Sequence, residues 1–115
     1  MILDWSRIRV FVKPGTTDMR KQINGLSLIV TEQLHQDVFE GHLYIFCNKQ
    51  RRLLKIIYWD KNGFCLWLKR LERDKFPWPQ NQTDALEITQ EQFGFLLSGI
   101  DFWNAHKKLN FSRVS

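Results

Sequence analysis

The sequence predicts an α+β fold: an antiparallel β-meander of four or five strands, with one longer amphipathic helix packed on it and a short C-terminal helix. Three observations predict it. Apolar residues recur at helical spacing between Asp18 and His35, a strong turn signal joins two runs rich in β-branched and aromatic residues, and 43% of the 115 residues are hydrophobic. A chain of this size and composition forms one packed domain. We expect that domain to span residues 1–103, with a loosely held tail at 104–115.

The N-terminal part is expected to hold one strand and the longer helix. Ile8–Val12 reads as a short strand, which Pro14-Gly15 ends. Side-chain oxygens at Thr16-Thr17-Asp18 are typical helix caps. In the helix that follows, apolar residues recur every three or four positions, at Met19, Ile23, Leu26, Val30 and Leu34.

The central part reads as a meander of three strands, His42–Cys47, Leu53–Trp59 and Phe64–Leu71. Asp60-Lys61-Asn62-Gly63 is a hairpin signal between the last two. Further along, Leu86–Ile88 is predicted as a final short strand. Thr89 and Gln92 have capping-box spacing at the start of a short helix that ends at Gly99.

The hairpin register decides which side chains share a face. With Gly63 as a bulge, Asp60 lies opposite Phe64, and Lys55 lies opposite Lys69. The face with these two lysines then also carries Trp59 and Trp67. We therefore expect flat aromatic rings beside ammonium groups on one surface of the hairpin.

The positive charge is concentrated in the same region. The chain has a formal net charge of +5, yet nine basic and three acidic residues between positions 49 and 75 give that segment +6. Such a cluster is typical of a polyanion footprint, whereas a solvated surface is the bland alternative. The predicted nucleic-acid-binding residues are Arg51, Arg52, Lys55, Trp59, Trp67, Lys69, Arg70, Arg73 and Lys75, with the two tryptophans available for stacking on bases. Tryptophan–lysine surfaces also bind proteins, and core packing explains tryptophans too.

No catalytic, metal or cofactor signature is present in the sequence. Glycine-rich phosphate loops, zinc-protease motifs and nucleophile elbows are missing. Asp18, Asp60 and Asp101 read as a helix start, a turn residue and a residue after a helix end. The histidines and the two cysteines lack metal-ligand spacing. The prediction is a protein that is not an enzyme, without cofactor or metal.

Localisation and partner binding follow from simpler features. No apolar run is long enough to span a membrane, no secretory signal is visible, and two cysteines are too few for a disulfide framework. A cytoplasmic protein without membrane contact is therefore expected. Trp78 lies between two prolines in Phe76-Pro77-Trp78-Pro79, where a rigid backbone favours a partner-binding anchor. Packing of Trp78 back over the sheet edge is the equal alternative.

The run from Tyr58 to Glu72 (YWDKNGFCLWLKRLE) resembles the small accessory protein, of TnpB type, that the second reading frame encodes in the insertion-sequence-sixty-six family of bacterial transposable elements. Further blocks follow in the family's order: Thr17-Asp18-Met19-Arg20-Lys21, Gly25-Leu26, Gly41–Phe46, Arg51-Arg52, Leu54-Lys55, Phe76, Trp78-Pro79 and Gly99-Ile100-Asp101. The likeness covers roughly residues 8–103. Two departures are Gln22, where the family often has glycine, and the longer, weakly basic tail in place of a short arginine-rich one.

The resemblance implies a role in DNA transposition beside a larger transposase of the same element, which supplies the acidic catalytic residues. Together with the charge pattern, it predicts a non-catalytic accessory protein that contacts DNA, expected at the element ends, through the basic central hairpin. The alternative is a protein-interaction module that organises the transposase without binding DNA. An independent nuclease ranks below both, and self-association is left open.

Overall fold

The computed structural model describes residues 3–80 and 85–103. Its elements are β1 (Val10–Val12), α1 (Ile23–Glu32), the 3-10 helix η1 (Val38–Glu40), β2 (Leu43–Cys47), β3 (Leu53–Asp60), β4 (Gly63–Arg70), β5 (Leu86–Ile88) and α2 (Gln90–Leu97). The predicted α+β class is confirmed. The predicted tail, 104–115, lies outside the described residues, so the domain boundary at residue 103 stays a prediction.

The five strands form one sheet in the order β4-β3-β2-β1-β5. All neighbours pair antiparallel except β1 and β2, which are parallel, with Val10 opposite Leu43. The expectation of a purely antiparallel meander is therefore wrong at this pair. The physical reason is the connection: the chain from β1 passes through α1 before it returns to β2, and such a crossover joins parallel strands.

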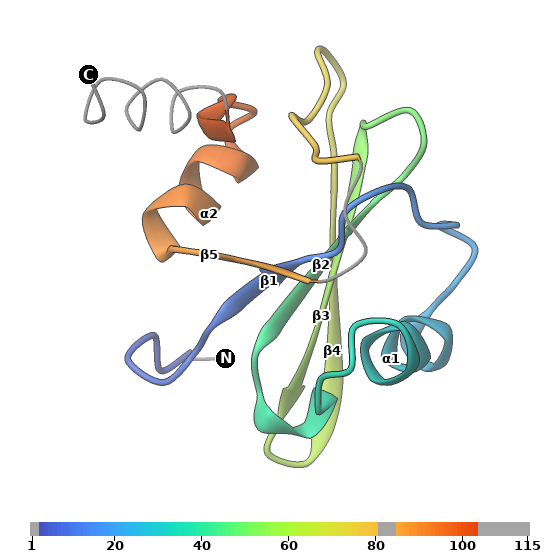
Figure 1. Ribbon diagram of the computed structural model, residues 1–115, viewed down its shortest axis with the longest axis vertical. Helices are drawn as coiled ribbons and strands as arrows, with labels where there is room; N and C mark the ends of the chain where they lie inside the picture. Colours follow the sequence, from blue (N-terminus) through green and yellow to red (C-terminus); the bar gives the residue numbers. More distant parts are fainter. Residues whose placement is uncertain (1–2, 81–84, 104–115) are drawn as a thin grey trace.

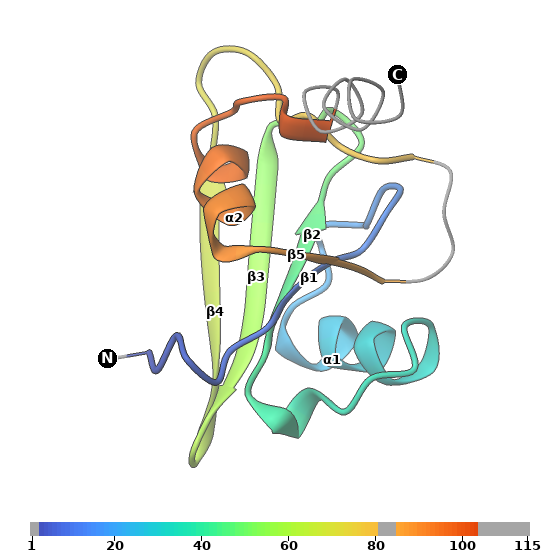
Figure 2. The ribbon, with the colours of Figure 1, turned by 60° about the vertical axis from the view of Figure 1, so that its left-hand side comes forward.

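The two helices cover opposite faces of the sheet (Figure 1). On one face, Leu26, Ile29 and Val30 of α1 pack on β1, β2 and β3. On the other, Phe93 and Leu96 of α2 pack on the same strands together with Phe76 and Trp78. Figure 2 shows β4 at the margin of this layered arrangement. The sheet therefore buries both faces at its centre, and β4 is the longer of its two edge strands.

The helix α1 begins later than the sequence pattern predicts. Its N-cap residue is Gln22, whose side chain makes no capping hydrogen bond, and Asp18 lies outside the helix. The Asp18 carboxylate instead accepts from the backbone N–H of Arg20 at 2.9 Å and from the Arg20 guanidinium at 2.7 Å. A local turn thus uses the oxygens that were expected to cap the helix.

The predicted capping box of the second helix is confirmed. The Thr89 side chain accepts from the Gln92 amide at 3.0 Å, and the Gln92 side chain accepts from the Thr89 amide at 2.9 Å. These two bonds satisfy donors that the first turn of a helix leaves unpaired. The first turn of α2 is therefore fixed at its N-cap residue, Thr89.

Candidate nucleic-acid interface

The β3–β4 hairpin has a two-residue turn, and its register differs from the predicted one. Asp60 pairs with Gly63, so Gly63 is a paired strand residue rather than the predicted bulge, and Lys61 in the turn has a left-handed φ of 53°. Lys55 therefore lies opposite Leu68, and Lys69 lies opposite Leu54. The prediction that Lys55 and Lys69 face each other is wrong, because a one-residue change of register moves every side chain to the other face.

Lys55 is buried beneath the segment that precedes α1. Its side chain is 4% exposed, and the ammonium donates to Met19 O at 2.8 Å, Lys21 O at 3.0 Å and Gln22 Oε1 at 3.4 Å. Three oxygens compensate the lost hydration of this charge. Lys55 thus ties the start of α1 to the sheet, away from any surface that DNA could approach.

Lys69 lies on the opposite face and also has a partner. Its ammonium donates to Leu97 O, in the last turn of α2, at 2.6 Å. A cation at this place satisfies a carbonyl that the end of a helix leaves unpaired and interacts well with the helix dipole. Lys69 is half-buried, and its main visible role is to join β4 to α2.

The two hairpin tryptophans are separated by the sheet. Trp59 lies on the α1 face in a group of rings with Phe39 and Phe64, at centroid distances of 5.0 and 4.9 Å. Trp67 lies on the α2 face and is 45% exposed. The predicted surface that combines both tryptophans with both lysines is therefore not formed.

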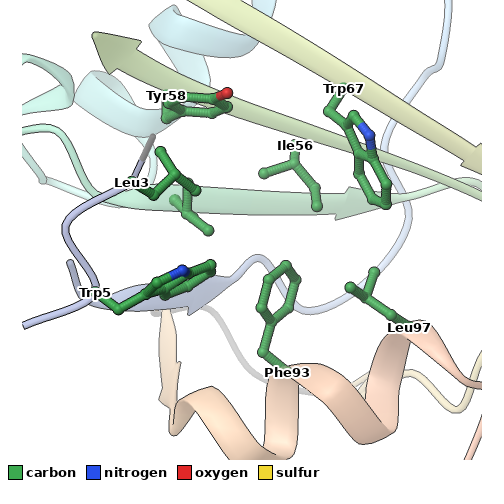
Figure 3. A pocket seen from close by; sticks show the side chains of 8 residues that line it. Leu3, Trp5, Ile56, Tyr58, Trp67, Phe93 and Leu97 are labelled. Atoms are coloured by element: carbon green, nitrogen blue, oxygen red, sulfur yellow. The ribbon is translucent and has the colours of Figure 1, made fainter. Parts of the chain in front are cut away.

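Trp67 lines a cavity of about 280 Å³ between the sheet, α2 and the N-terminal segment. In Figure 3, Phe93 and Leu97 rise from α2 towards the strands, Leu97 lies below Trp67, and Trp5 lies on the side opposite Trp67. All eight lining residues are apolar or aromatic: Leu3, Trp5, Leu43, Ile56, Tyr58, Trp67, Phe93 and Leu97. Sequence reasoning missed this cavity because its walls come from five separate segments: the N-terminal segment, β2, β3, β4 and α2.

Five of the predicted basic residues gather at one end of the hairpin. The Leu71 amide donates to Arg52 O at 2.7 Å, and the Phe76 amide donates to Arg51 O at 2.6 Å, so the β2–β3 turn and the segment after β4 lie side by side. We call this surface the basic end; its cations, all exposed, are Lys49, Arg51, Arg52, Arg70, Arg73 and Lys75. Glu72 and Asp74 are the acidic residues within the same two segments, and Glu72 pairs with Arg70 at 2.9 Å.

Trp78 does not lie on the surface. It is 6% exposed, belongs to the core on the α2 face, and its indole N–H donates to Gly15 O at 2.9 Å and Lys13 O at 3.1 Å. The exposed anchor predicted between the two prolines is therefore corrected to the alternative, a ring packed back on the domain. An indole with a satisfied N–H fits a buried site.

The candidate acidic residues do not gather as a metal site in the described part of the chain. Within residues 3–80 and 85–103, no three His, Cys, Asp or Glu side chains come together around a common point. The Arg20 guanidinium holds the pKa of Asp18 at about 2. Asp60 pairs with Gly63 at the hairpin turn, and Asp101 follows α2.

No helix in the described part of the chain is long and apolar enough to cross a membrane.

Comparison with known proteins identifies the family to which the chain belongs. Residues 8–107 match the family described as IS66 Orf2 like protein. The chain is 39% identical over 102 residues to the uncharacterized protein y4hO of Sinorhizobium fredii, with 89% of both chains covered. It is 34% identical over 101 residues to the uncharacterized protein y4jC of the same organism, with 88% of this chain and 86% of that one covered. No solved structure matches.

Proposed function

Because the chain belongs to the IS66 Orf2-like family, whose members are accessory proteins associated with transposition, we propose that it contacts DNA phosphates through the basic end. It acts beside the larger transposase of the same element and is itself non-catalytic. The observation that carries the proposal is the gathering of six exposed cations from two chain segments on one surface.

The basic end suits phosphates better than bases. Apart from Arg70 at the end of β4, its cations extend from turns rather than from a helix or a β-ribbon that could enter the major groove. Phosphate contacts position a protein on DNA without reading its sequence, so we expect little selectivity from this surface alone. Of the residues first considered, Arg51, Arg52, Arg70, Arg73 and Lys75 carry the contact. Lys55 and Lys69 support it only by holding the hairpin to α1 and α2.

The DNA contact is tested by replacing arginines of the basic end. The Arg51→Gln and Arg52→Gln double variant should bind duplex DNA roughly tenfold more weakly at low salt, since each phosphate contact contributes a salt-dependent electrostatic term. Arg7→Gln is the matched control, because Arg7 is 87% exposed in the N-terminal segment, outside the basic end. Equal affinities for the double variant and the control would contradict the proposal.

The non-catalytic role has its own test. Purified protein with magnesium or manganese should neither nick nor join element-end DNA. The support for this expectation is that no three His, Cys, Asp or Glu side chains among residues 3–80 and 85–103 gather as a metal site, and that Asp18 is held by Arg20. Metal-dependent cleavage that is lost when Asp18, Asp60 or Asp101 is replaced would overturn the proposal.

A second function, a module that organises the transposase without DNA, is favoured by one specific observation. Trp67 and Leu68 are 45% and 52% exposed on neighbouring positions of the edge strand β4. The two side chains lie on opposite faces of the strand, and a protein partner at its edge could cover both, whereas phosphates need cations. If this function holds alone, the protein binds transposase and its DNA affinity is negligible at physiological salt.

A further inference from the structure

We propose that the outer edge of β4 binds an extended, apolar segment of another protein chain, with acidic residues at one end, as an added strand of the sheet. The proposal goes beyond the DNA contact, because it concerns a strand edge and a protein partner. Strand addition uses main-chain hydrogen bonds for affinity and neighbouring side chains for specificity.

The backbone of β4 offers a regular set of donors and acceptors. The Leu71 amide donates to Arg52 O, and because antiparallel pairs alternate, residues 63, 65, 67 and 69 bond towards β3. Phe64, Leu66, Leu68 and Arg70 therefore direct their N–H and C=O groups to the outer edge. No segment among residues 3–80 and 85–103 pairs with that edge.

Most of the usual protections of an edge strand are missing in β4, where Arg70 at its end is the exposed charge. The strand has eight residues, contains no proline, and pairs with β3 without a bulge from Gly63 to Arg70. Edge strands are ordinarily short, bulged or guarded by charged side chains. The opposite edge strand, β5, follows this rule with three residues. On β4 the ammonium of Lys69 is turned to Leu97 O, so it does not guard the edge.

The side chains on this edge require an apolar partner on both faces. Trp67 is exposed on the α2 face, where it also lines the cavity, and Leu68 is exposed on the α1 face. An added strand places successive side chains beside both residues. The partner segment therefore has a continuous apolar run rather than strict alternation.

Charge indicates which end of the partner is acidic. Beyond Leu68 the strand leads into the basic end, at Arg70 and Arg73. The β4 strand of a second copy of this chain, Gly63–Arg70, contains no acidic residue that could lie along the edge. In the parallel orientation it would place Lys69-Arg70 beside Lys69-Arg70. An acidic segment of a different chain fits the edge better.

The test uses a short synthetic peptide of alternating valine and tyrosine that ends in several glutamates. The wild-type protein should bind it, and Leu68→Glu should weaken binding at least about tenfold, since it removes an apolar contact and repels the glutamates. Leu68 is 52% exposed, so the Leu68→Glu variant should still fold, which thermal unfolding checks. Leu28→Glu is the matched control, because Leu28 is 55% exposed on α1; its affinity should equal that of wild type.

Two probe controls separate the parts of the proposal. A peptide methylated on alternate backbone amides should not bind, because it cannot form the strand hydrogen bonds. A peptide ending in lysines should bind at least about tenfold more weakly. Equal binding of the lysine peptide, or equal losses in the two leucine variants, would overturn the proposal. Two further results would overturn the proposal. One is a wild-type dimer in sedimentation that the Leu68→Glu substitution dissociates. The other is protection of the β4 amides from hydrogen exchange by duplex DNA alone.

Discussion

Lys55 and Lys69 lie on opposite faces of the sheet but have the same kind of structural role. Lys55 and Lys69 each donate to backbone carbonyls, at Met19 and Leu97 respectively, and each fixes one helix to the hairpin. Their exposed neighbours Arg51, Arg52 and Arg73 have no such role in packing. A count of charges in the sequence includes all of them equally, so at this scale the structure separates cations that hold the fold from cations available to a partner.

Replacement of Lys55 should lower stability without affecting DNA binding. Lys55→Met leaves Met19 O and Lys21 O unpaired in a buried place, which costs about 1–3 kcal/mol. Urea unfolding measures this loss, and Lys49→Met in the exposed β2–β3 turn is the control, with little change in stability and weaker DNA binding. A stable Lys55→Met variant with reduced DNA affinity would contradict this assignment.

Trp78 gives the second prediction at this scale. Trp78→Ala should lower the free energy of unfolding by about 3–5 kcal/mol, because the ring is buried and its N–H pairs with two carbonyls. Thermal unfolding should show a drop of many degrees. A melting temperature close to wild type, with loss of transposase association, would restore Trp78 as a surface anchor.

At the scale of elements, the sequence predicts a helix end where one local motif decides it. It does not predict a helix end where several side chains compete for the same backbone groups. The capping box at Thr89 and Gln92 was predicted from spacing and is present. The start of α1 was predicted at Asp18, but Asp18 pairs with Arg20 and Lys55 binds the carbonyls at Met19 and Lys21. That competition involves a residue far along the chain, so no local pattern contains it.

The predicted register of the β3–β4 hairpin is wrong for a related reason. Asp60-Lys61-Asn62-Gly63 predicts a turn, yet the turn closes either with a bulge at Gly63 or with two residues between paired ends. The second form occurs, with Lys61 in a conformation that lysine seldom adopts. The packing of β4 agrees with this register: Cys65 packs on the α2-face core, whereas Phe64 and Leu66 pack on the α1-face core. The candidate site changed with it, because the predicted tryptophan–lysine face depended on the other register.

Loss of the α2 cap tests the element directly. Thr89→Ala should lower the free energy of unfolding by about 1 kcal/mol, because the Gln92 amide loses its acceptor. Thr31→Ala on the exposed side of α1 is the control, where a better helix former should leave stability unchanged or slightly raised. Chemical denaturation of both variants gives the comparison. Equal stability of Thr89→Ala and wild type would mean that α2 does not depend on this cap.

At the scale of the whole molecule, the sheet is covered on both faces and buries titratable groups at its centre. Burial raises the pKa of the Cys47 thiol to about 12 and that of the Tyr44 hydroxyl to about 12. In the unfolded chain the ordinary values are 9.0 and 10.0. The parallel pair β1–β2, which supplies part of this centre, was not predictable from strand patterns because orientation depends on the path through α1.

These pKa values predict a loss of stability in alkali. Between about pH 9 and pH 12 the unfolded thiol and phenol release protons that the folded state retains, so the free energy of unfolding decreases as pH rises. Cys47→Ala should reduce that decrease by up to about 1.4 kcal/mol per pH unit. Urea unfolding from about pH 8 to about pH 11 measures both proteins. Parallel pH profiles for wild type and Cys47→Ala would show that Cys47 ionises equally in both states.

The most direct measurement of the central claim is the salt dependence of DNA binding by the whole domain. With about four phosphates contacted by the basic end, the logarithm of affinity should fall against the logarithm of salt concentration with a slope of roughly −3 to −4. The Arg51→Gln and Arg52→Gln double variant should lower the magnitude of that slope by up to about 2, whereas Arg7→Gln should leave it unchanged. An affinity that does not respond to salt, or a double variant with the wild-type slope, would contradict a phosphate contact at the basic end.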